Sequence, residues 1–139
     1  MKHLIKNNQR VARFGAVGII NTLIDFGLLF FLKSLGLPVG AANVISIGIA
    51  FLFSFVANRK FTFRSNDGSI TRQFILFIAI TLFGLWVIQT AIIQLTLPWL
   101  SALFGNTTIA LFVAKAIATS VTLVWNYLLY NKVVFKDSL

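Results

Sequence analysis

The sequence predicts an all-α membrane protein with four transmembrane helices. Of its 139 residues, 58% are hydrophobic and only 11% are charged, whereas about a quarter of the residues in a soluble protein carry a charge. Four apolar segments, 14–32, 37–57, 74–97 and 107–130, each approach the ~20 residues that a helix needs to cross ~30 Å of hydrocarbon. The remaining residues are too few to form a soluble catalytic domain.

The helices are predicted in chain order from these segments and the polar stretches that separate them. A basic arm precedes the first helix, a turn near Pro38 leads into the second, the polar stretch "RSNDGSITR" precedes the third, and a connection around Pro98 to Asn106 precedes the fourth. The expected helices span about 12–34, 38–58, 72–97 and 107–131. The whole chain, 1–139, is predicted to form a single transmembrane domain.

The basic residues predict how the chain is oriented in the membrane. Ten of the 12 fall on one side of the predicted helices: Lys2, Lys6, Arg10, Arg13, Arg59, Lys60, Arg64, Arg72, Lys132 and Lys136. On the opposite side only Lys33 occurs, at a helix end where its side chain can extend to the interface. The positive-inside rule therefore places both termini and the middle loop in the cytoplasm. Because topology accounts for the net charge of +9, we expect no nucleic-acid partner.

The two halves of the chain resemble each other. A shift of 72 residues places Ser54 on Asn126, Lys60 on Lys132 and Phe63 on Phe135, and a shift of 60 places Phe14 on Phe74 and Pro38 on Pro98. The difference corresponds to a 12-residue insertion between the third and fourth helices. The halves are then two repeated hairpins, a parallel repeat about an axis along the membrane normal. Chance similarity between helices rich in Phe and Leu is the alternative explanation.

Two ionisable residues fall within the predicted spans. Asp25 lies about 18 Å along the helix axis from Arg13, and Lys115 lies about 24 Å from Asn131. Each costs roughly 2.5–3.5 kcal/mol at the centre of a membrane helix, so each is a candidate functional residue. Their opposite charges suggest a pair, since the depths differ by about one helical turn and a lysine side chain can span that distance.

Polar and small residues continue along the same helices. Lys115, Thr119, Thr122 and Asn126 recur at steps of four, three and four, which places them on one helical face. Corresponding stripes hold Asn43, Ala50 and Ser54 on the second helix and Gly18, Asn21, Thr22 and Asp25 on the first. These faces predict either a polar path through the bundle or close packing between helices, because small and polar residues serve both purposes.

Three stretches carry a resemblance to a known family. They are "RFGAVGIINTLIDFGLLFFL", "ANVISIGIAFLFSFVANRKFTFR" and "WNYLLYNKVVF". Together they resemble the GtrA-like family of small bacterial membrane proteins over nearly the whole chain. The sequence departs from the family pattern at Ser54, Phe61, Val133 and Tyr130–Asn131, so the second copy is degenerate. The resemblance implies translocation, or flipping, of a polyprenyl-phosphate-linked sugar across the bacterial inner membrane, for glycosylation of cell-surface polysaccharide.

With that substrate, the basic and polar residues become candidate binding sites. Arg13, Arg59, Lys60 and Lys132 are expected near the headgroup layer, where Arg and Lys suit phosphate oxygens. The sugar path is expected to use Asn21, Asp25, Asn43, Lys115 and Asn126. Anchoring of "NRKFTF" at the interface is the simpler alternative for the second segment. The expected partners are the polyprenyl-phosphate glycolipid and membrane lipids, and a homo-oligomer would enclose more volume.

Two other functions fit the same sequence. One is a proton-coupled exporter of the small multidrug type that uses Asp25, and the other is a non-transporting membrane subunit of a glycosyltransferase complex. An enzyme is not expected, because the sequence offers no paired carboxylates and no nucleophile with a base. With no Cys and a single His, we also predict no metal site, and no cofactor.

Overall fold

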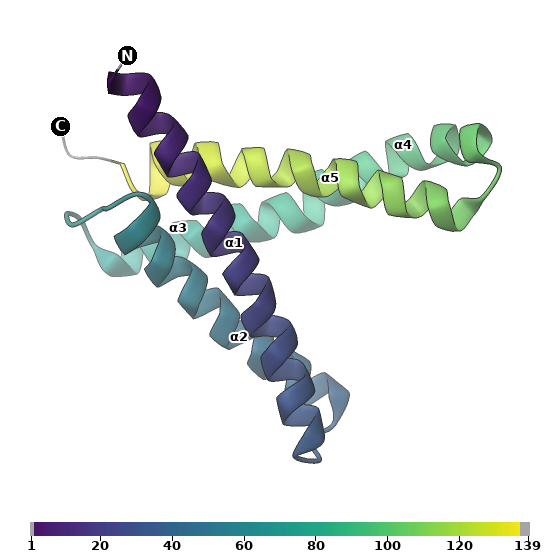
Figure 1. The fold of residues 1–139 in the computed structure, drawn as a ribbon, viewed down its shortest axis with the longest axis horizontal. Helices are drawn as coiled ribbons and strands as arrows, with labels where there is room; N and C mark the ends of the chain where they lie inside the picture. The colour runs from purple at the N-terminus through teal and green to yellow at the C-terminus, as the bar shows by residue number, and fades with distance from the viewer. Residues whose placement is uncertain (1, 137–139) are drawn as a thin grey trace. The chain divides into compact units, whose positions relative to one another are not determined.

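The computed structural model describes residues 2–136, and within that range the chain is helical and contains no strand. Four apolar helical stretches in the described residues are long enough to cross a membrane, which confirms the predicted all-α membrane fold. The elements, shown in Figure 1, are α1 (Lys2–Ser34), α2 (Val39–Ala57), η1 (Asn58–Thr62), α3 (Ile70–Phe83), η2 (Gly84–Ile88), α4 (Gln89–Phe104), α5 (Thr107–Leu129) and η3 (Tyr130–Val134). They fall into two compact units, which meet in the sequence between Asp67 and Gly68.

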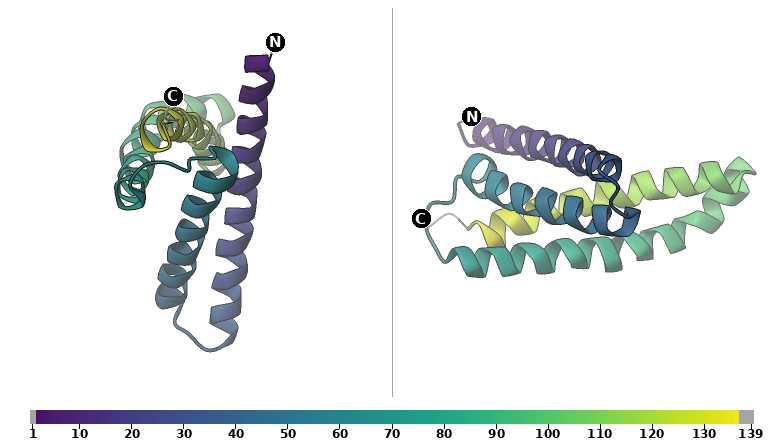
Figure 2. Two further views of the ribbon diagram at one scale, coloured as in Figure 1. Left: turned by 90° about the vertical axis from the view of Figure 1, so that its left-hand side faces the viewer. Right: turned by 90° about the horizontal axis from the view of Figure 1, so that it is seen from below.

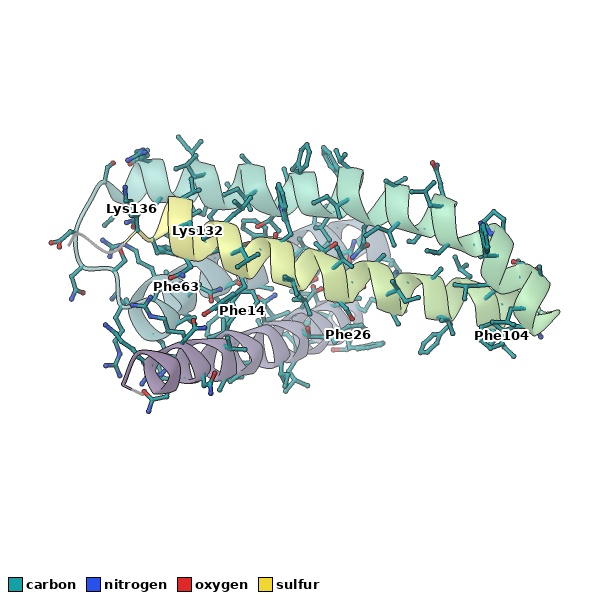
Figure 3. All side chains as sticks on the ribbon, turned by 90° about the horizontal axis from the view of Figure 1, so that it is seen from above. Phe14, Phe26, Phe63, Phe104, Lys132 and Lys136 are labelled. Atoms are coloured by element: carbon teal, nitrogen blue, oxygen red, sulfur yellow. The ribbon has the colours of Figure 1, made fainter. Side chains whose placement is uncertain are left out.

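The first unit is a helical hairpin of α1 and α2 that ends in the π-helix η1. The two helices run side by side in both views of Figure 2. Ala42, Ser46 and Ala50 are buried at four-residue intervals on α2, and such small side chains let two helices approach closely. Near the open end of the hairpin, the rings of Phe14 and Phe63 lie 6.5 Å apart (Figure 3).

The second unit is a longer hairpin, in which α3, η2 and α4 form one continuous helix packed against α5. The buried face of α5 repeats every four residues and consists of Ala110, Ala114, Ala118, Thr122 and Asn126. This face needs Gly84 opposite it, because a Cβ atom there would lie 2.9 Å from Cγ2 of Thr122. Trp125 adds a hydrogen bond from its indole nitrogen to the carbonyl oxygen of Ile80, 3.3 Å away.

Two helix boundaries differ from the sequence prediction. α1 begins at Lys2 rather than near residue 12, so the basic arm is itself helical. α4 continues through Pro98 to Phe104 instead of ending at 97. A proline removes one helical hydrogen bond, but in a long apolar helix local adjustments can satisfy the freed backbone group. The prediction that this helix ends before its proline therefore made the helix too short.

The second hairpin turns later than predicted. Gly105 ends α4 in the left-handed conformation with φ of 62°, which glycine adopts without steric cost. Asn106 then begins α5, since its side-chain oxygen accepts hydrogen bonds from the backbone nitrogens of Thr108 and Ile109 at 2.9 and 3.2 Å. The extra residues of this half therefore lengthen both of its helices instead of forming a loop between them.

Each hairpin ends in a five-residue π-helix at the C-terminal end of its second helix. In η1 the backbone nitrogen of Phe63 donates to the carbonyl of Asn58 at 2.8 Å, and in η3 that of Phe135 donates to Tyr130 at 2.8 Å. These are bonds to the fifth preceding residue rather than the fourth. Phe63 and Phe135 are both 1% exposed, so in each unit the change of helical pitch directs a phenylalanine into the packed interior.

Candidate functional site

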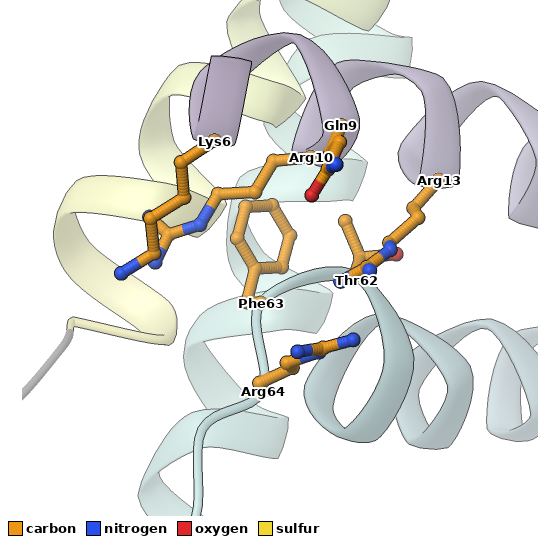
Figure 4. Close-up of a pocket in the computed structure, with 7 residues that line it drawn as sticks. All are labelled: Lys6, Gln9, Arg10, Arg13, Thr62, Phe63 and Arg64. Atoms are coloured by element: carbon orange, nitrogen blue, oxygen red, sulfur yellow. The ribbon is translucent and has the colours of Figure 1, made fainter. Parts of the chain in front are cut away.

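The first hairpin contains a pocket of about 230 Å³ that is lined mainly by cations. Its lining residues, drawn in Figure 4, are Lys6, Gln9, Arg10, Arg13, Thr62, Phe63 and Arg64. In this view Lys6 and Arg10 lie on one side of the Phe63 ring, and Arg13, Thr62 and Arg64 lie on the other. Four positive charges thus surround one small space. Their mutual repulsion is relieved when an anion occupies it.

Three of these cations come from one face of α1. Lys6, Arg10 and Arg13 are separated by four and three residues, so they project from the same side of the helix. Like charges at this spacing destabilise a helix by roughly 0.2–0.5 kcal/mol per pair, and α1 has no acidic residue in its first turn to offset them. The arrangement opposes helix stability, and an anion bound in the pocket would offset part of this repulsion.

The fourth cation, Arg64, occupies a strained backbone position. Its φ is 51°, the only positive φ of a non-glycine residue in the described part of the chain. A left-handed conformation costs an L-residue roughly 1–2 kcal/mol. The turn is held by a 2.8 Å hydrogen bond from the backbone nitrogen of Ser65 to the carbonyl of Arg59. This turn brings Arg64 to the pocket, where glycine would relieve the strain but supply no charge.

Two residues of η1 complete the pocket and its rim. Thr62 is 1% exposed, and its buried hydroxyl has no hydrogen-bond partner in the structure. Arg13 lies 5.3 Å from the centre of the exposed Phe61 ring, a distance at which a guanidinium is attracted to an aromatic face. The pocket therefore offers a neutral hydrogen-bonding group among its cations, and Phe61 helps to position one of them.

The structure divides the four residues predicted to bind phosphate. Arg13 lines the pocket, whereas Arg59 and Lys60 belong to η1 but do not line it. Lys132 lies in η3 of the second hairpin, at the same end of that hairpin as Lys136 and at the opposite end from Phe104 (Figure 3). The structure thus groups Arg13 with three cations that were not among the predicted site residues.

Within the membrane-length part of the first hairpin, Asp25 forms a specific interaction. Ser46 of α2, which is fully buried, donates a 2.7 Å hydrogen bond to the Asp25 carboxylate on α1. Asn21, one helical turn earlier on α1, has a buried side-chain oxygen that accepts no hydrogen bond in the structure. Polar groups therefore continue along the interface between α1 and α2.

The other predicted path residues have mixed environments. Asn126 is buried on α5, on the same face as Thr122 and Thr119, which belong to the polar stripe but not to the predicted path. Thr119 is half-buried and accepts a 3.3 Å hydrogen bond from Gln89. Lys115 is exposed on α5, and Asn43 is exposed on α2. The predicted pairing of Asp25 with Lys115 joins two separate units, and it stays a prediction, as does a path that uses all five residues.

Sequence reasoning missed Lys6, Arg10, Arg64 and Ser46. Lys6 and Arg10 were recoverable, because they share a helical spacing with Arg13 once the helix is extended toward the N-terminus. Ser46 was recoverable from the four-residue spacing of small residues on α2. Arg64 was not, since its place in the pocket depends on a positive φ that nothing in the local sequence requires.

Comparisons with known proteins agree with this architecture. Residues 13–135 match the family described as GtrA/DPMS, transmembrane domain. The chain is also 33% identical over 134 residues to the "Uncharacterized membrane protein YngA" of Bacillus subtilis (strain 168), with 94% of this chain and 82% of that protein covered. The matched region contains three of the four membrane-length helices in full and the first from residue 13 onward. The chain therefore belongs to the GtrA/DPMS transmembrane-domain family.

Proposed function

We propose that this protein translocates a polyprenyl-phosphate-linked sugar across the bacterial inner membrane, for glycosylation of cell-surface polysaccharide. The observation that carries the proposal is the pocket formed by Lys6, Arg10, Arg13 and Arg64 at one end of a membrane-length hairpin. Arginine presents a planar set of donors that matches phosphate oxygens, and lysine adds a mobile point charge. Membership of the GtrA/DPMS family supports the same substrate class.

The position of the pocket along the first hairpin supports binding of a lipid phosphate. It is lined from the first turns of α1 and from the end of η1, at one end of the apolar stretches Lys6–Ser34 and Ala41–Thr62. A lipid phosphate lies in the headgroup layer, just beyond the hydrocarbon that such stretches cross. The isoprenoid chain then stays in lipid, and only the polar head needs a route through protein.

The proposed orientation places this pocket on the cytoplasmic side, with both termini in the cytoplasm. Ten of the 12 basic residues belong to the arm, the middle loop and the C-terminal end, as the positive-inside rule requires. We also infer that the two hairpins are parallel repeats. The inference is supported by η1 and η3, which begin at Asn58 and Tyr130, 72 residues apart, the same shift that aligns the sequences.

We place the route for the sugar along the first hairpin, beyond the phosphate pocket. Asn21 and Asp25 lie on α1 in the direction of the opposite membrane face, and Asp25 is already bonded to Ser46 across the hairpin. Hydroxyl groups crossing hydrocarbon need acceptors of this kind, because an unpaired polar group there costs several kcal/mol. Asn43, Lys115 and Asn126 stay predicted members of the route, and a membrane glycosyltransferase stays a predicted partner.

The test is transport of a fluorescent polyprenyl-phosphate sugar in proteoliposomes that contain the full chain. Arg13→Gln combined with Arg64→Gln should slow translocation at least tenfold, because two of four pocket charges are lost. The matched control, Arg59→Gln with Lys60→Gln, removes the same charge from η1 outside the pocket and should retain translocation within about threefold of wild type. Equal transport by all three proteins would disprove phosphate capture at this pocket. Equal loss in both double variants would show that general surface charge is responsible.

A further inference from the structure

Two buried carboxamide oxygens in the first hairpin lack hydrogen-bond donors. They are Oδ1 of Asn21 on α1 and Oδ1 of Asn58, the first residue of η1, and both are buried without a partner in the structure. A polar atom buried in this way costs about 1–3 kcal/mol, so few occur without a reason. Both residues lie in stretches of membrane length, where water does not readily compensate.

The amide orientation at Asn58 is fixed by its nitrogen. Nδ2 donates to the backbone oxygen of Ser54 at 2.9 Å and lies 3.3 Å from the Ser54 hydroxyl oxygen. Exchanging the oxygen and nitrogen would set the Asn58 oxygen against the Ser54 carbonyl, two acceptors facing each other. The unpaired atom is therefore the acceptor, and what it lacks is a donor from elsewhere.

In the second hairpin, the residues at the two corresponding positions hydrogen-bond to each other. The shifts of 60 and 72 residues align Asn21 with Thr81 and Asn58 with Tyr130. The hydroxyl groups of Thr81 and Tyr130 hydrogen-bond to each other. Tyr130 also stacks on Phe77 with ring centres 4.5 Å apart. The side chains at this pair of positions thus hydrogen-bond to each other in the second hairpin, whereas in the first hairpin their oxygens have no partner.

A third position shows the same contrast, and it belongs to the phosphate pocket. Thr62 aligns with Val134, so the first hairpin has a hydroxyl where the second has a methyl group. The Thr62 hydroxyl is buried without a partner and follows Asn58 by one helical turn. Thr62 lies between Asn58 and Arg64 in the sequence, and it lines the pocket together with Arg64.

We propose that Asn21, Asn58 and Thr62 form a subsite that binds sugar hydroxyl groups beside the phosphate pocket. The inference rests on the proposed function. It specifies how the protein distinguishes the glycosylated lipid from the same lipid without sugar. Two carboxamide oxygens accept hydrogen bonds from the hydroxyl groups of a sugar, whereas a fully deprotonated phosphate has no hydroxyl group to donate. An ammonium headgroup also donates, but Lys6, Arg10, Arg13 and Arg64 would repel it.

The experiment introduces the Thr81 and Tyr130 side chains of the second hairpin at the aligned positions of the first hairpin. Full-length protein in phosphatidylcholine nanodiscs is titrated with polyprenyl-phosphate glucose and with the same polyprenyl phosphate without sugar. Asn21→Thr with Asn58→Tyr should weaken binding of the glucose lipid about tenfold and leave the bare carrier within about twofold. The control, Thr81→Val with Tyr130→Phe, alters the aligned positions of the second hairpin and should change neither affinity.

Four results would overturn the subsite, and the last of them would also overturn the proposed function. Unchanged glucose-lipid binding by the variant Asn21→Thr with Asn58→Tyr, or equal loss of both lipids, removes the sugar role and leaves phosphate binding by the pocket standing. Displacement of the glucose lipid by phosphatidylglycerol as efficiently as by unlabelled glucose lipid shows a general polyol headgroup site. Binding of neither lipid by wild type overturns the proposed function together with the subsite.

A single substitution separates a binding role from a structural one. Asn21→Ala removes an oxygen that makes no hydrogen bond in the structure, so the melting temperature should stay the same or rise. Binding of the glucose lipid should still fall, by about threefold or more. A lower melting temperature with unchanged lipid binding would identify Asn21 as a packing residue.

Discussion

Ser46 donates a 2.7 Å hydrogen bond to the carboxylate of Asp25, which joins α2 to α1 inside the membrane-length part of the first hairpin. Ser46→Ala leaves that carboxylate without this donor, so we expect a loss of about 1–3 kcal/mol in the free energy of unfolding. Denaturant unfolding in detergent micelles measures it. The control is Ser120→Ala, because the exposed Ser120 hydroxyl bonds only to the Ala116 carbonyl of its own helix, and it should change stability by less than about 0.5 kcal/mol.

Asp25 itself distinguishes the proposed function from proton-coupled export. Asp25→Asn keeps an oxygen that can accept from Ser46, so translocation of the lipid-linked sugar should stay within about fivefold of wild type. Asp25→Leu removes every acceptor and should slow translocation more than tenfold. The measurement is the same proteoliposome assay, with and without a pH gradient. Complete loss in Asp25→Asn, together with gradient-driven export of hydrophobic cations by wild type, would favour the exporter.

Arg64 combines strain with a role in the pocket, so stability and binding should respond in opposite directions. Arg64→Gly relieves the positive φ of 51° and should stabilise the protein by roughly 1 kcal/mol. It also removes one of four pocket cations and should weaken binding of polyprenyl phosphate severalfold. Arg64→Gln keeps the strain and loses the charge, so it should weaken binding equally without stabilising. Full binding by Arg64→Gly would remove this residue from the site.

Gly84 is required by the packing of the second hairpin. A methyl group there would meet Thr122 Cγ2 at 2.9 Å and Asn126 Oδ1 at 3.2 Å, so Gly84→Ala should destabilise the protein by about 1–3 kcal/mol. Gly48 on α2 has nothing within 4 Å of the corresponding position. Gly48→Ala should therefore be neutral or stabilise by up to about 1 kcal/mol. Thermal unfolding of both variants in detergent tests the contrast, and equal effects would contradict the close approach.

The hydroxyl contact between Thr81 and Tyr130 should contribute measurably to the second hairpin. Tyr130→Phe keeps the stack on Phe77 and removes only the hydroxyl group, so we expect a cost of about 0.5–1.5 kcal/mol. Thr81→Val should cost a similar amount, and the double variant should cost little more than either one. A double-mutant cycle of unfolding free energies measures the coupling. Additive effects would mean that the two hydroxyls do not stabilise each other.

Composition and charge were enough to predict the class of fold. Long apolar runs must form helices in lipid, because each backbone group then finds its partner within the same segment. The helix ends were less predictable. Pro98 indicated a boundary that α4 passes through, and Lys2 to Arg13 read as an arm although they form the first turns of α1. Local residue preferences are weak compared with continuation of an existing helix.

The candidate site was predicted only in part. Arg13 was chosen for its charge and its position at a helix end, and it lines the pocket. Arg59 and Lys60 were chosen for the same reasons but do not line it, because the π-helical pitch of η1 sets where each side chain projects. A shift of the backbone hydrogen bonds by one residue changes the direction of every following side chain. The sequence gives no clear signal for such a shift.

The sequence by itself determined that this protein lies in a membrane, that it has four apolar helices, and at which helix ends its cations gather. These properties depend on sums of apolar area and charge along the chain. Only the tertiary structure decided which cations share a pocket and which polar atoms find a partner. Arg64 reaches the pocket through one unusual backbone angle, and the side-chain oxygen of Asn58 lacks a partner whereas the Tyr130 hydroxyl has one in Thr81. Such outcomes depend on ångström-scale positions of two helices at once, which no single stretch of sequence specifies.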